Sequence, residues 1–113
     1  MDEQNPAPGE PWNAENVAQM FLEAGRRFHG KTALIAHKND KGERPSLTYD
    51  GLARRARAVA DGLIQADLRP GDRVMLLADN RAEWMVSSVA VTLAGGIDVP
   101  RGNDATNDEI NYI

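Results

Sequence analysis

The stretch that most constrains the fold is residues 70–100, where two short apolar runs flank a longer helical run. A Pro70-Gly71-Asp72 turn leads into Arg73–Ala78, which suits a strand buried on both faces and ends at Asp79-Asn80. A helix is predicted from about residue 81 to residue 93, stopped by Gly95-Gly96, and Ile97–Val99 predicts a second strand closed by Pro100. This order predicts a parallel sheet flanked by helices, with a right-handed crossover. The predicted fold class is α/β.

The preceding residues predict a tail and a first helix. Residues 1–12 contain three prolines among acidic and small residues, which is typical of an extended tail. Asn13 is the expected N-cap of a helix that ends near residue 29, with Gly30 as its terminator. Its predicted apolar face consists of Val17, Met20, Phe21 and Ala24.

A hairpin and a second helix are predicted next. Thr32–Ala36 and Pro45–Tyr49 are β-prone runs separated by a polar loop, so they are expected to pair as antiparallel strands. Thr48 is the expected N-cap of the following helix. That helix carries an apolar stripe at three-and-four spacing. The stripe consists of Leu52, Ala56, Val59, Ala60, Leu63 and Ile64.

Composition excludes several classes of function. The 113 residues carry a net charge of -4, which disfavours binding to nucleic acid, and they include no cysteine, which rules out disulfides and thiolate sites within this sequence. The acidic start does not resemble an export signal, so the cytoplasm is the default location. The uncharged run of residues 84–97 is too short to cross a bilayer and predicts a buried helix.

A helix-start signal lies close to the last residue of the sequence. Thr106-Asn107-Asp108-Glu109 matches a capping box, but only residues 110–113 follow it. Because so short a helix is marginal without packing, we expect that the chain is cut short.

Candidate chemical groups are few. His29 and His37 have no obvious partner, and no spacing suits a metal site. Asp79 and Asn80 follow the first predicted parallel strand, at the sheet edge where α/β proteins bind ligands. The favoured interpretation is that one of the two caps the next helix.

Other polar or aromatic residues have simpler expected roles. Trp84 and Met85 could line an apolar pocket, although core packing is the stronger expectation. Asp98 is either an acid with a shifted pKa or a group on an exposed face or hydrogen-bonded to a loop. Gly95-Gly96 lacks the spacing of a phosphate loop. The arginines at 54, 55 and 57 are expected on a solvated helix face.

Several short segments occur in a distinctive order from Ser46 onward. They are Leu47-Thr48-Tyr49, Leu52, Pro70-Gly71-Asp72-Arg73-Val74, Asp79-Asn80-Arg81 with Glu83-Trp84, Ala94-Gly95-Gly96 and Val99-Pro100. Each is weak alone, but their order and spacing are fairly specific. Together they resemble the beginning of the AMP-binding, adenylate-forming superfamily, over about residues 15–113.

The finer resemblance is to long-chain fatty acid–CoA ligases. It is carried by Val99, Pro100, Arg101, Gly102, Asp104 and Thr106. Two residues depart from the pattern: Asp67 stands where a glycine is common, and Ala105 stands where a second threonine is often found.

The resemblance implies a parent enzyme that activates a carboxylate with ATP, forming an acyl-adenylate and pyrophosphate, and then transfers the acyl group to coenzyme A. Family members use a phosphate loop, an acidic residue at the ribose and a lysine of a mobile C-terminal domain. All three fall downstream of this region, so residues 1–113 are assigned no catalytic, cofactor-binding or metal-binding residue. ATP, Mg²⁺ and CoA are therefore cofactors of the parent enzyme, and the chain alone is expected to be inactive.

On this interpretation residues 1–12 are a tail, and residues 13–113 are the N-terminal portion of an AMP-binding domain, truncated before the phosphate loop. The expected partners are the remainder of the enzyme and a fatty acid, with a homodimer and peripheral membrane contact left open. An alternative is a self-contained α/β module that binds a partner and catalyses nothing. A receiver-like domain with a phosphorylated Asp79 is disfavoured because no second acidic cluster could hold magnesium.

Overall fold

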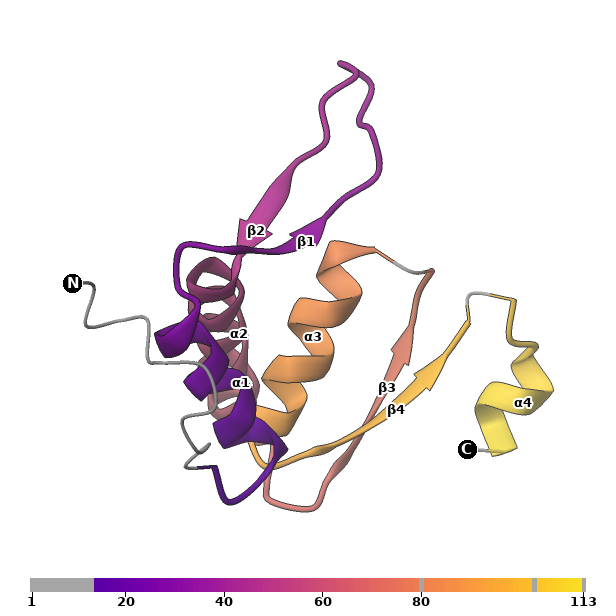
Figure 1. Cartoon of the computed structure of the whole chain (residues 1–113). Coiled ribbons are helices and arrows are strands. Elements are labelled where there is room, and N and C mark those ends of the chain that lie inside the picture. Colours follow the sequence, from indigo (N-terminus) through magenta and orange to yellow (C-terminus); the bar gives the residue numbers. More distant parts are fainter. Residues whose placement is uncertain (1–13, 80, 103, 113) are drawn as a thin grey trace.

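The computed structural model describes residues 14–79, 81–102 and 104–112. Its elements follow the predicted order of a helix, a hairpin, a second helix and a strand–helix–strand unit (Figure 1). They are α1 (Val17–Arg27), β1 (Thr32–Ile35), β2 (Ser46–Thr48), α2 (Tyr49–Gln65), β3 (Arg73–Leu77), α3 (Ala82–Leu93), β4 (Ile97–Arg101) and α4 (Asn107–Tyr112). The α/β fold class predicted from the sequence is confirmed. The predicted tail lies outside the described residues.

The hairpin is confirmed, with β1 antiparallel to β2. Backbone pairing continues past the strands, because the Ala36 N–H donates to the Pro45 carbonyl at 2.8 Å. The Asn39 side chain organises the tip, where its Oδ1 accepts from the backbone N–H groups of Lys41 and Glu43 at 3.0 and 2.9 Å. These bonds shape an arm that extends beyond the helices (Figure 1).

The first two helices, α1 and α2, each begin after a residue whose side chain caps the helix. Thr48 caps α2 as predicted, with its Oγ1 accepting the Gly51 N–H at 3.0 Å. The predicted cap of α1 at Asn13 is wrong, because the helix begins three residues later. Asn16 is its N-cap, and Asn16 Oδ1 accepts the Gln19 N–H at 2.9 Å. Asparagine is a good N-cap residue at either position, and the structure shows that Asn16 is the one that caps the helix.

The strand–helix–strand unit forms the parallel pair that the sequence predicts, with Arg73 opposite Ile97 and Leu77 opposite Arg101. Two details differ. Pro100 lies inside β4 rather than after it. β3 is not buried on both faces, because none of its five residues is fully buried and Arg73 and Leu77 are exposed. α3 packs against both strands of the pair, and no other described helix does so to a comparable extent.

Three residues with positive φ shape the connections around this unit. Asp67 follows α2 with φ 72°, and its N–H donates to the Ile64 carbonyl at 3.0 Å. Gly71 and Gly95 both have φ 86° and are joined by a 2.9 Å bond from the Gly71 N–H to the Gly95 carbonyl. Gly95 therefore ends α3 as predicted, in the left-handed conformation that glycine adopts without strain.

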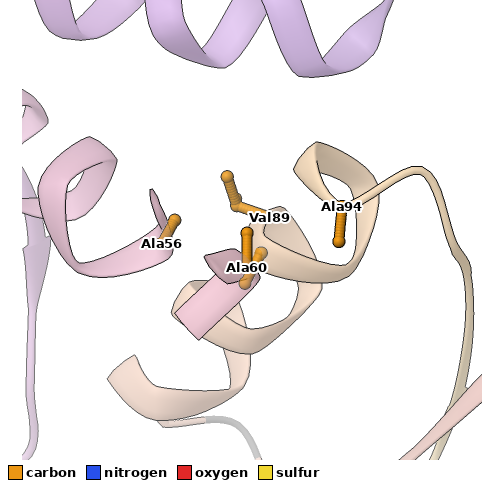
Figure 2. Close-up of a cluster of buried hydrophobic side chains, with 5 residues drawn as sticks. Ala56, Ala60, Val89 and Ala94 are labelled. Carbon is orange, nitrogen blue, oxygen red and sulfur yellow. The ribbon is translucent and has the colours of Figure 1, made fainter. Parts of the chain in front are cut away.

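The core lies between α2 and α3 (Figure 2). Its members are small, which lets the two helices approach closely. They are Ala56, Ala60, Val89, Ala90 and Ala94. The uncharged run at 84–97 is thus the buried helix that was predicted.

The predicted apolar faces of α1 and α2 are only partly buried. Phe21 and Leu63 pack against the core, whereas Val17, Met20, Val59 and Ile64 are exposed. Close contact at Gly25 explains part of this on α1, because a Cβ there would lie 3.0 Å from the Ala53 Cβ of α2. α1 therefore packs against α2 through the helix face that carries Gly25.

The predicted capping box is confirmed at the start of α4. The Glu109 N–H donates to Thr106 Oγ1 at 3.2 Å, and the Thr106 N–H donates to Glu109 Oε2 at 3.4 Å. Among the described residues, no helix is both long and apolar enough to span a membrane.

Candidate functional site

A groove of about 700 Å³ lies between the hairpin and the start of α3. Its apolar lining comes from both sides, with Leu34 and Ile35 on the hairpin and Trp84 and Met85 on α3. Charged and polar side chains also line it. They are His37, Lys38, Asn39, Asp79, Arg81 and Glu83. The groove is thus lined by four of the candidate residues named in the sequence analysis, which are His37, Asp79, Trp84 and Met85.

The prediction that Asp79 or Asn80 caps α3 is not supported at Asp79. Arg81 is the N-cap residue, and its side chain makes no capping hydrogen bond. Asn80 lies outside the described residues. Asp79 therefore lines the groove and does not cap the start of α3. Trp84 is half-buried and lines the groove, whereas Met85 lines the groove and also packs against the core as predicted.

The charges around the groove are nearly balanced. Arg81 Nε lies 3.9 Å from Glu83 Oε2, and both side chains are mostly exposed, so this pair contributes little. Within the described residues, no group of three or more potential metal-binding side chains occurs. The groove has the volume and the apolar lining of a small-molecule or peptide site. Its side chains can bind and orient a partner, but they include no nucleophile activated by a base.

The structure places His29 elsewhere, in the connection between α1 and β1. Its carbonyl accepts the Asp50 N–H at 3.2 Å. Its Nδ1 is buried and has no hydrogen-bond partner within the described part of the chain. His29 does not line the groove, so the two histidines do not form one site.

Asp98 has a structural partner on α3. Ser88 Oγ donates to Asp98 Oδ2 at 2.7 Å, and both groups are partly buried. The bond joins the centre of α3 to the second residue of β4. The hydrogen bond to a loop that was one of the predicted alternatives is not found, because the donor Ser88 is on helix α3. Sequence spacing could not show this contact, because the crossover geometry brings the two residues together.

The arginines of α2 lie on a solvated face, as predicted. Arg54 pairs with Asp50 at 3.0 Å, and its side chain is 75% exposed. Arg55 and Arg57 are also exposed. Gly95 and Gly96 end α3 and pack closely, and a Cβ at Gly96 would lie 3.2 Å from the Asp72 carbonyl oxygen. They form a tight turn rather than a phosphate loop.

One charged cluster was not anticipated. Arg26 Nε donates to Glu23 Oε2 at 3.1 Å, and the buried Arg27 donates through Nε to Glu23 Oε1 at 2.8 Å. Hydrogen bonds from Arg26 and then from Arg27 lower the pKa of Glu23 to about 2. The three- and four-residue spacings of these side chains were the available signal. The cluster stabilises α1 near its C-terminal end.

The order of the elements and motifs resembles the beginning of adenylate-forming enzymes, and comparison with known proteins gives the family. The AMP-binding enzyme family matches residues 21–113, so the chain belongs to that family. A long-chain-fatty-acid–CoA ligase of Mycobacterium tuberculosis is 28% identical over 108 residues, which are 96% of this chain and 18% of that protein. A component of the linear gramicidin synthase of Brevibacillus parabrevis is 29% identical over 99 residues, covering 88% of this chain and 2% of that protein.

Solved structures agree with this assignment. The N-terminal subdomain of NpsA from Klebsiella oxytoca, in complex with anthranilyl-AMSN, superposes with a TM-score of 0.76 and 26% identity. The match covers 85% of this chain and 24% of that one. The chain therefore has the fold of part of an adenylate-forming N-terminal subdomain, and it spans less than a fifth of the mycobacterial ligase.

Proposed function

We propose that this chain forms the N-terminal portion of an enzyme that activates a carboxylic acid with ATP. The observation that carries the proposal is the family match over residues 21–113, which spans the strand–helix–strand unit and the capped α4. In the proposed reaction a carboxylate oxygen attacks the α-phosphorus of ATP. The acyl-adenylate forms, and pyrophosphate leaves.

The proposed second step is transfer to coenzyme A. The thiolate of CoA attacks the acyl carbonyl, the thioester forms, and AMP leaves with the electron pair of the broken C–O bond. The proposed acid is a long-chain fatty acid, which would make the enzyme an acid–thiol ligase. Two observations support a long-chain fatty acid as the substrate. The mycobacterial relative is a long-chain-fatty-acid–CoA ligase, and this chain contains the Val99-Pro100-Arg101-Gly102 segment with Asp104 and Thr106. ATP, Mg²⁺ and CoA are the proposed cofactors, and the cytoplasm is the proposed location.

We assign none of the chemical steps to a residue of this chain. Residues 13–113 are proposed as a structural portion of the AMP-binding domain, upstream of its phosphate loop. The proposed partner is accordingly the remainder of the enzyme, which would bring the phosphate loop, the ribose-binding acid and the catalytic lysine.

The test starts from the native transcript, sequenced past the codon for Ile113. The encoded protein is then purified and assayed for AMP and pyrophosphate formation with ATP, CoA and a panel of fatty acids and amino acids. We expect long-chain fatty acids to give an acyl-CoA and stoichiometric AMP. Adenylation of amino acids without CoA transfer would favour the chemistry suggested by the gramicidin synthase relative and would overturn the fatty acid assignment.

The chain of 113 residues provides the matched control. Assayed alone under the same conditions, it is expected to release no AMP or pyrophosphate above the rate without protein. A measurable rate would show that chemistry resides within these residues and would contradict the assignment of the reacting groups to the rest of the enzyme.

A second candidate is a self-contained binding module without catalysis. The observation that favours it is the groove, whose apolar lining and charged rim suit a bound partner. A stop codon directly after Ile113 in the native transcript would select this candidate, whereas an open frame that leads to a phosphate loop would exclude it.

A further inference from the structure

We draw no further inference here: the strongest candidate, the groove between the β1–β2 hairpin and the start of α3, is a partly apolar surface of a chain that spans 24% of the NpsA subdomain it matches, and nothing in the described part of the structure shows what covers it.

Discussion

The layer of helices and the sheet are stabilised in opposite ways. Between α2 and α3, alanine and valine side chains are almost wholly buried, and Val89 is only 1% exposed (Figure 2). In the sheet, α3 covers one face, while Leu77 and Ile97 on the other face are 45% and 51% exposed. Within the described residues of this chain, tight burial therefore comes from packing between helices, and the strands bury less of their side-chain surface.

The contrast between the helical layer and the sheet predicts the largest loss of stability for a substitution at Val89. Val89→Ala removes two methyl groups from the most closely packed part of the helical layer, and it is expected to lower the free energy of unfolding by about 2 kcal/mol. Urea unfolding followed by circular dichroism measures the change. Val59→Ala makes the same truncation at a residue that is 41% exposed, and its effect is expected to stay within about 0.5 kcal/mol. Equal effects would contradict the assignment of the core.

The next largest effect is expected where α1 meets α2. Gly25→Ala places a Cβ 3.0 Å from the Ala53 Cβ and 3.4 Å from the Tyr49 carbonyl oxygen, so the helices must separate. We expect a net loss of about 1–2 kcal/mol in thermal or urea unfolding. Gly62→Ala is the control, because a Cβ there meets nothing within 4 Å. It should raise stability by up to about 1 kcal/mol through helix propensity. A stabilising Gly25→Ala would show that this contact is loose.

The link between the two regions is the Ser88–Asp98 hydrogen bond. Ser88→Ala removes the donor that lies 2.7 Å from Asp98 Oδ2, and the expected loss is about 1 kcal/mol in urea unfolding. Ser87→Ala, at the neighbouring half-buried position, should change stability less. If the two variants were equivalent, water would be replacing the hydroxyl, and α3 would hold β4 through apolar contacts alone.

The smallest effect is expected on the solvent side of the helical layer, at Glu23. Arg26 and Arg27 lower its pKa from 4.5 to about 2, so the ionised carboxylate stabilises the folded state above pH 4.5. This contribution is lost as the pH falls through about 2. Glu23→Gln should therefore lower the melting temperature at pH 7, and the difference from the original chain should shrink between pH 4.5 and pH 2. A difference that is constant with pH would contradict the cause assigned to the shifted pKa.

Sequence patterns predicted the parts of the fold that depend on local chemistry. Thr48 and the Thr106–Glu109 box mark helix starts because their hydrogen bonds close within three residues. The strand–helix–strand unit was predicted from apolar runs that are separated by turns containing glycine. The prediction that Asn13 is the N-cap of α1 was wrong. Asn16 has the same side chain, and capping propensity alone does not decide between the two.

The groove could not be predicted, because it depends on how the hairpin sits over the start of α3. His37 and Asp79 are more than forty residues apart in the sequence, and only the tertiary arrangement places both beside Trp84. The Ser88–Asp98 bond has the same origin. The exposure of β3 on one face also escaped prediction, since an apolar run shows what a strand could bury and not which elements cover it.

Asp67 shows why one departure from the family pattern is tolerated. Its φ of 72° lies in the left-handed region, which fits the glycine that the resembled family pattern has at this position. Aspartate is one of the few other residues that adopt this conformation at modest cost. We therefore expect only glycine, asparagine and aspartate to be accepted at this position. The backbone conformation at residue 67 thus limits which side chains the fold accepts there.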